Sequence, residues 1–209
     1  MNSRFLIIRT AVGLAGGALL LGFASTAMAA EYDSDGVDVN VRIAPLNGGG
    51  ALSMTIAGTS TALTEDGSDG DRRQFLGALP TVTVSDTRDA EDIPDGAAWY
   101  VTGIASDFTT TDGKVIGAEH LGWTPRILSG NDSGLVTEGE QVDTILDEGP
   151  DNTGLDGDEF GGELFALAAD SADARSDGSW TATADLFLRT PVDVDAGDYS
   201  STLTLSLFE

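Results

Sequence analysis

SWTATADLFLRT (residues 179–190) and DYSSTLTLSLF (residues 198–208) are the two segments of the chain with the clearest β-strand patterns. In the second segment leucine alternates with threonine and serine, so that one face of an extended strand would carry Leu203, Leu205 and Leu207. Successive side chains of a strand point to opposite faces. The pattern therefore predicts strands with one buried and one polar face.

Shorter runs of the same kind occur earlier in the chain, separated by turns rich in Asp, Gly, Ser and Thr. They are VDVNVRI (37–43), ALSMTIAG (51–58), LPTVTVSDT (79–87), AAWYVTGIASDF (97–108) and EHLGWTPRIL (119–128). Short alternating strands without helices between them are typical of antiparallel sheets. The sequence predicts an all-β fold, an antiparallel β-sandwich of Ig-like or Greek-key type with long acidic loops.

Three stretches do not fit the alternating pattern. Residues 65–73 and residues 129–162 are polar, and the second stretch predicts a long acidic surface loop or insertion. Within this loop the spacing of Val142, Ile145 and Leu146 indicates one amphipathic helical turn. The segment ELFALAADSADA (163–174) fits either a strand or a short helix.

The first 29 residues have the pattern of a signal peptide. Arg4 and Arg9 precede an apolar stretch at 11–24, and Ala27-Met-Ala29 supplies the small residues that signal peptidase requires. The stretch is shorter than the roughly 20 residues that span a bilayer, although an uncleaved anchor is the alternative. We therefore expect a secreted protein, with a single domain at 30–209 and no membrane span in the mature chain.

The chain is strongly acidic, with 10 basic and 35 acidic residues and a net charge of −25. Loss of Arg4 and Arg9 with the signal peptide would bring this charge to −27. Nucleic acid is excluded as a partner, because its recognition depends on Lys and Arg contacts to phosphate. The charge fits either a salty medium or the solubility of a secreted protein. The chain has no cysteine, which excludes disulfides and thiolate metal sites.

No catalytic motif is present. His120 is the only histidine, so a structural role is expected for it and a multi-histidine metal site is impossible. No phosphate-binding glycine loop or nucleophile elbow occurs. A carboxylate pair of a glycan hydrolase remains a minor alternative, since 35 acidic residues give many chance pairs. We expect a protein that is not an enzyme.

Two Asp-Gly-rich loops are candidates for calcium binding. DNTGLDGDEFGGE (151–163) offers Asp151, Asp156 and Asp158, and TEDGSDGD (64–71) is the second loop. Calcium takes six to eight oxygen ligands from flexible loops, but neither loop has EF-hand spacing. The alternative is a solvated acidic turn, so we expect no obligatory cofactor, with calcium as an option.

All three tryptophans, Trp99, Trp123 and Trp180, lie in predicted strands. Aromatic rings bury large areas in a sandwich core, and they can also stack on sugars. Both roles are open at the level of sequence.

The segment 79–208 resembles the WxL domain of Gram-positive surface proteins, in its secreted actinobacterial variant. Trp99 and Val101 stand in the first Trp-x-Leu motif, with valine in the place of leucine. IGAEHLGWTP (116–125) and Pro191 also match in order. The distal motif is matched by Tyr199, Leu203, Leu205 and Leu207, and Leu205 replaces its tryptophan.

The resemblance implies a β-rich domain that attaches non-covalently to the cell wall through peptidoglycan, with these six motif positions involved. Other surface proteins are further candidate partners. The alternative is a structural or adhesive Ig-like subunit of a surface layer, fibre or extracellular matrix. This alternative rests on the exposed edges of the predicted sheets, which can pair between chains.

Overall fold

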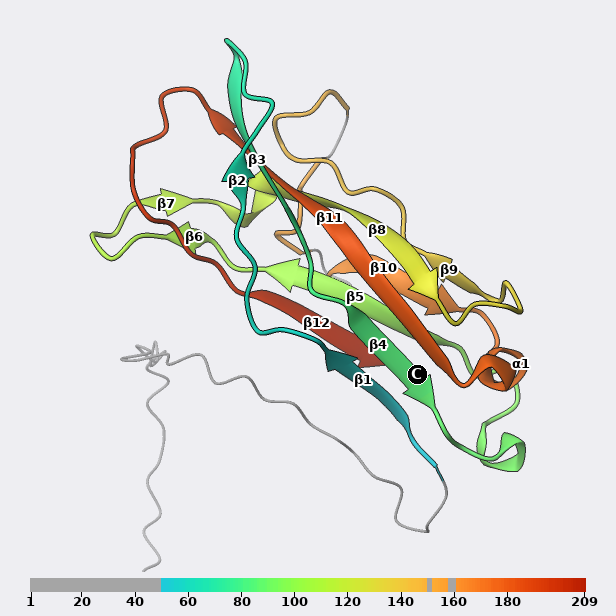
Figure 1. Cartoon of the computed structure of the whole chain (residues 1–209). Coiled ribbons are helices and arrows are strands. Elements are labelled where there is room, and N and C mark those ends of the chain that lie inside the picture. Colours follow the sequence, from blue (N-terminus) through green and yellow to red (C-terminus); the bar gives the residue numbers. More distant parts are fainter. Residues whose placement is uncertain (1–49, 150–151, 158–160) are drawn as a thin grey trace, which may run out of the picture. The chain divides into compact units, whose positions relative to one another are not determined.

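The computed structural model describes residues 50–149, 152–157 and 161–209, which form two antiparallel β-sheets (Figure 1). Sheet A contains β1 (Leu52–Ile56), β2 (Thr64–Glu65), β3 (Arg72–Ala78), β4 (Val82–Asp86), β8 (Leu121–Ser129) and β11 (Ser179–Pro191). Sheet B contains β5 (Trp99–Ala105), β9 (Val136–Glu138), β10 (Glu163–Ala168) and β12 (Leu203–Phe208). A separate hairpin pairs β6 (Phe108–Thr109) with β7 (Val115–Ile116).

The helical elements are single turns: η1 (Ala90–Asp92), η2 (Ala118–His120), α1 (Ser171–Ala174) and η3 (Arg175–Asp177). No helix in the described ranges is long and apolar enough to cross a membrane. The predicted all-β antiparallel sandwich is confirmed, while its Ig-like or Greek-key topology stays a prediction. The predicted signal peptide at 1–29 and the run at 37–43 lie outside the described residues.

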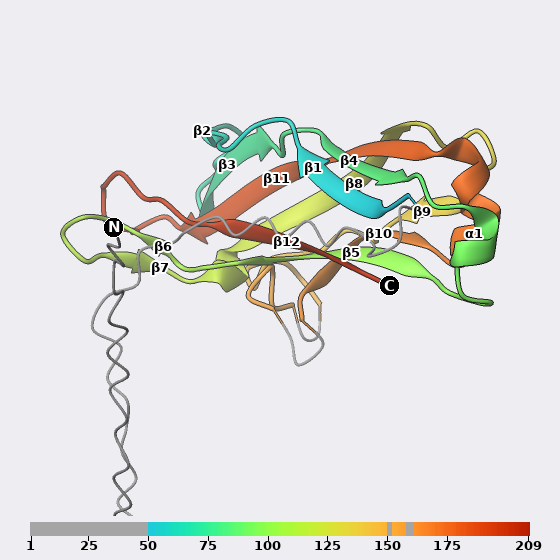
Figure 2. The same ribbon diagram turned by 90° about the horizontal axis from the view of Figure 1, so that it is seen from below.

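Sheet A is organised around β11. This strand of 13 residues pairs with β8 along one edge. Along its other edge it pairs first with β4, from Ser179 to Ala182, and then with β3, from Asp185 to Pro191. In sheet B the strand order is β12-β5-β10-β9. Figure 2 shows the two sheets as layers, with β11 and β8 in one and β5 and β12 in the other.

The core is built by aromatic rings that meet from opposite sheets. Trp99 of sheet B lies 5.2 Å from Trp180 of sheet A, measured between ring centroids. Trp123 of sheet A lies 5.4 Å from Phe165 of sheet B. All four side chains are buried, so the tryptophans are core residues and do not face solvent for sugar stacking. Their three indole N–H groups make no hydrogen bond within the described structure, so packing alone holds the rings.

The prediction of a surface loop at 129–162 is wrong for several of its residues. Residues 136–138 form β9, and Val142 forms a β-bridge with Trp123 of β8. Thr144 and Leu155 are fully buried. The predicted helical turn at Val142 is a bridge followed by a hydrogen-bonded turn. Buried apolar side chains of this acidic segment, Val136 and Leu155, therefore help to close one side of the sandwich.

Two ambiguous stretches are settled by the structure. The segment 163–174 contains both predicted alternatives, the strand β10 followed by the helix α1. The stretch 65–73 was predicted as a polar loop. Its first residue is the last residue of β2, and its last two residues are the first two of β3.

A buried ion-pair group joins the ends of the two sheets. The Arg88 guanidinium donates to Asp86, the last residue of β4, and to Glu209, which follows β12, each at 2.6 Å. The hydrogen bonds that Arg88 donates to the Asp86 carboxylate outweigh burial, so the pKa of Arg88 is raised above its usual value. Removing one partner of such a buried pair is strongly destabilising.

Gly103 provides a test of the core packing. A Cβ at this position would lie 2.4 Å from Cη2 of Trp123 and 3.0 Å from Cδ2 of Leu205. We expect Gly103→Ala to lower the free energy of unfolding by about 1–3 kcal/mol through overpacking, measured by urea denaturation. Gly70→Ala is the control, because no atom lies within 4 Å of its Cβ position. Equal stabilities of the two variants would contradict the packing.

Candidate functional site

The residues of the WxL-like motif meet on two neighbouring strands. Trp99 and Val101 lie in β5, and Leu203, Leu205 and Leu207 lie in β12, which pairs with β5. Leu207 is the direct cross-strand neighbour of Val101. The two β5 residues are completely buried, and the three leucines are half-buried against the core. The side chains at these five positions thus pack in or against the core and keep β5 and β12 in place. They do not form an exposed surface.

Tyr199 lies before β12 and also has a structural contact. Its hydroxyl donates to the carbonyl oxygen of Asp195 at 3.0 Å, and its ring is half-buried against the core. The Cβ of a residue replacing Gly197 would lie 3.3 Å from the Tyr199 ring. The turn before β12 is therefore shaped around this tyrosine.

The outer face of sheet B carries an exposed aromatic pair that sequence reasoning did not single out. Tyr100 of β5 and Phe208 of β12 are direct cross-strand neighbours, and their rings stack with centroids 5.1 Å apart. The two residues are 38% and 39% exposed. On the other side of Tyr100 the cross-strand neighbour is Leu167 of β10. We call Phe208, Tyr100 and Leu167 the aromatic row.

The remainder of this outer face is partly covered by the acidic segment. Thr102 donates from Oγ1 to the carbonyl oxygen of Gly161 at 2.9 Å, and the backbones of Gly157 and Gly162 lie against Ile104. The aromatic row lies at the opposite end of β5 from Ile104. Its three side chains are uncharged, although the chain as a whole carries a net charge of −25.

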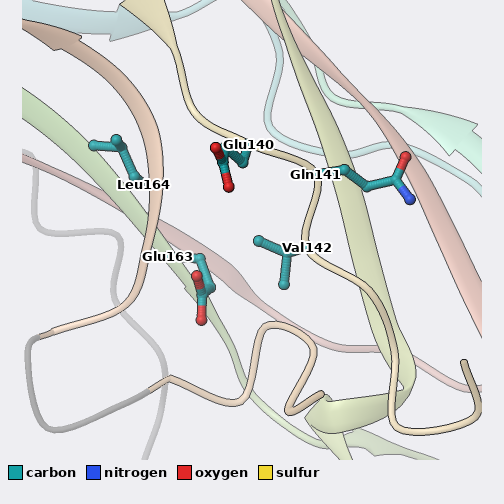
Figure 3. A pocket seen from close by; sticks show the side chains of 5 residues that line it. All are labelled: Glu140, Gln141, Val142, Glu163 and Leu164. Atoms are coloured by element: carbon teal, nitrogen blue, oxygen red, sulfur yellow. The ribbon is translucent and has the colours of Figure 1, made fainter. Parts of the chain in front are cut away.

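A hollow of about 340 Å³ lies beside the β-bridge between Val142 and Trp123. Figure 3 shows Glu140, Glu163 and Val142 around this space, while the Gln141 side chain points away from it. Gln141 instead accepts from Thr124 Oγ1 at 2.9 Å.

Three carboxylates from distant parts of the chain come together near η2. The carboxylate oxygens of Asp107, Glu119 and Asp156 all lie within 4.8 Å of one another. Asp107 also accepts from the backbone N–H of Ala118 at 3.1 Å. Of the three candidate calcium ligands Asp156 belongs to this cluster, and Asp151 and Asp158 lie outside the described residues. No sequence spacing connects Asp156 to its two neighbours.

In the other predicted calcium loop, two acidic residues already have partners. Glu65 accepts from Arg73 and from Ser68, each at 2.8 Å. These hydrogen bonds, that from Arg73 first, lower the pKa of Glu65 to about 2. Asp69 accepts from the backbone N–H groups of Asp71 and Arg72. These bonds organise a tight turn between β2 and β3.

Asp147 anchors the acidic segment to sheet A, and no sequence pattern pointed to this residue. Its carboxylate accepts from Arg72 of β3 at 2.8 Å and from Arg189 of β11. The backbone N–H and the hydroxyl of Thr144 donate to it at 2.9 and 2.8 Å. Beside it, His120 donates from Nδ1 to the Arg189 carbonyl at 2.7 Å, a structural role as expected.

The pH dependence of stability tests the Asp147 anchor. Burial raises the pKa of Asp147, but the hydrogen bonds from Arg189 and Thr144 lower it more, so its pKa is below its ordinary value. Its contribution is present above the unfolded pKa of about 3.9 and is lost as the pH falls through the lower folded pKa. We expect Asp147→Asn to cost about 2 kcal/mol at neutral pH, measured by urea denaturation.

The difference between wild type and Asp147→Asn should shrink below about pH 4, as the wild-type carboxylate takes up its proton. Asp193→Asn serves as a control, since Asp193 is exposed. A destabilisation by Asp147→Asn that stays constant down to the lowest pH would contradict the assignment.

The carboxylate cluster predicts a local response to divalent cations. Its three carboxylates repel one another at low ionic strength, and a divalent cation offsets this repulsion. We expect millimolar calcium to raise the melting temperature of wild type more than that of Asp156→Asn, measured by calorimetry. Equal shifts in wild type, Asp156→Asn and Asp193→Asn would mean that calcium acts only on the general surface charge.

No protein-family model matches this chain, and no curated protein matches it in sequence.

Proposed function

We propose that the chain is a secreted, non-enzymatic module that binds the cell wall non-covalently, and that the aromatic row contacts the glycan. One observation carries the proposal. The two strands that hold the WxL-like motif positions, β5 and β12, also present the exposed stacked pair of Tyr100 and Phe208.

The chemistry of the aromatic row fits a neutral sugar. Pyranose rings have faces of C–H groups that pack on aromatic side chains, and tyrosine adds a hydroxyl for hydrogen bonding. An anionic polymer would be repelled by a chain of net charge −25. The uncharged aromatic row therefore favours contact with the glycan strands of peptidoglycan over contact with anionic wall polymers.

The buried motif residues have an indirect part in this proposal. Trp99 and Val101 flank Tyr100 in β5 and fill the core beneath it. Leu207 packs beside Val101 and precedes Phe208. The alternation of the strand then directs Tyr100 and Phe208 outward. The motif positions thus act by orienting the outward residues.

Wall binding by variants of the aromatic row tests the proposal. Purified protein is mixed with isolated sacculi, and the bound fraction is measured after sedimentation. We expect Tyr100→Ala and Phe208→Ala each to weaken binding about tenfold, since a contact residue contributes roughly 1–2 kcal/mol. Both residues are exposed, so the fold should persist, and circular dichroism checks this point.

Val115→Ala is the matched control, because Val115 is 59% exposed in β7, on the separate hairpin. Binding is measured at both ~0.1 M and ~1 M salt, since the higher salt screens the repulsion between the chain and anionic wall polymers. Protein that stays in the supernatant under both conditions, or that binds equally well as wild type and as Tyr100→Ala, would refute the proposal.

A further inference from the structure

Two strands on one side of the sandwich have edges with which no described strand pairs. These strands are β1, the outermost strand of sheet A beside β4, and β12, the outermost strand of sheet B beside β5. Figures 1 and 2 both place β1 and β12 on the same side of the molecule. We call residues 52–56 and 203–208 the open side. The other side is closed by the bridge between Val142 and Trp123.

The hydrogen bonds of β12 show which of its backbone groups point outward. The Ser106 N–H donates to the Thr202 carbonyl at 2.9 Å, so Thr202 faces β5. Antiparallel pairing alternates along a strand. The backbone groups of Leu203, Leu205 and Leu207 therefore point away from β5.

The same argument applies to β1. The Thr87 N–H donates to Ala51 at 3.1 Å, and the Ala57 N–H donates to Thr81 at 2.8 Å, so Ala51 and Ala57 face β4. By alternation, the backbone groups of residues 52, 54 and 56 point away from β4. Each edge thus presents three residues whose N–H and C=O groups have the spacing of a β-ladder.

The side chains on the open side are apolar and incompletely covered. Five of them pack against the core and remain half-buried: Leu52, Met54, Leu203, Leu205 and Leu207. Ile56 is 42% exposed. Natural sheets usually protect their edges with charges, proline or bulges. Neither strand of the open side contains a charged residue or a proline, in a chain with 35 acidic residues.

We propose that the open side accepts an extended strand of another polypeptide, with aliphatic side chains at every second position and neutral or basic residues between them. Such a strand would satisfy the outward backbone groups and cover the half-buried side chains, as in other cases of strand addition. Charge favours this partner over a second copy of the chain, because two copies of net charge −25 repel each other. The inference is independent of wall binding, which uses the outer face of sheet B.

A synthetic peptide tests the inference. The probe is a fluorescent peptide of alternating valine and threonine with a lysine at each end, and its binding to the full chain is followed by anisotropy. Leu205→Pro removes an N–H that points away from β5, so it blocks strand addition without removing a bond of sheet B. Leu205→Ala keeps this N–H and is the matched control. We expect Leu205→Pro to bind the peptide at least tenfold more weakly than Leu205→Ala.

A second measurement on the unmodified chain keeps the test valid if Leu205→Pro does not fold. Amide hydrogen exchange followed by NMR should show that the peptide protects the N–H groups of Leu203, Leu205 and Leu207. Their neighbours Thr204 and Ser206 face β5 and should change little. Wall binding by sedimentation should be the same for the unmodified chain with and without the peptide, which separates this inference from the proposed function.

Three results would overturn the inference. One is equal binding of the peptide to Leu205→Pro and Leu205→Ala. Another is protection of the three leucine amides before any peptide is added, which would mean that the chain itself covers the edge. The third is concentration-dependent dimerisation with the same protection, which would identify a second copy as the occupant.

Discussion

The contacts between aromatic rings of opposite sheets are the constraint on which the rest of the structure depends. Trp99 against Trp180, and Trp123 against Phe165, fill the space between the sheets without a disulfide. A buried ring of this size removes about 150–250 Å² from water, which corresponds to roughly 4–6 kcal/mol before the loss of conformational entropy. Gly103 leaves the room that the Trp123 ring needs, because a Cβ at this position would meet that ring.

This interior determines the surface through the alternation of the strands. Because Trp99 and Val101 must face inward, Tyr100 between them must face outward. In β12 the inward leucines likewise place Phe208 outward, beside Tyr100. One pattern of residues thus produces both the core and the aromatic row. Trp99 is a core residue of this fold, and the exposed aromatic residues are its neighbours.

The alternating pattern predicted the fold class and most long strands, because half-buried strands such as β4, β5 and β12 have a two-residue period. It missed β3, where Arg72 and Arg73 are compensated by Asp147 and Glu65. Sequence spacing could not identify such partners, since Asp147 is distant in the sequence from Arg72 and Arg189, the two arginines that it binds. For the same reason, sequence spacing could not predict that Asp107 and Glu119 lie beside Asp156. The acidic composition of 129–162 concealed Leu155, a single apolar residue that is completely buried.

The position of β11 near the end of the chain has a consequence for the order in which the protein can fold. Strands β3, β4 and β8 each pair with β11, and none of them pairs with another of the three. During synthesis, sheet A therefore lacks its central strand until residues 179–191 have emerged. Strands whose partners are distant in the sequence pair slowly, because the chain loses the entropy of closing a long loop before the stabilising contacts can form. A nascent chain of this design cannot complete sheet A until residues 179–191 are available to pair with all three strands.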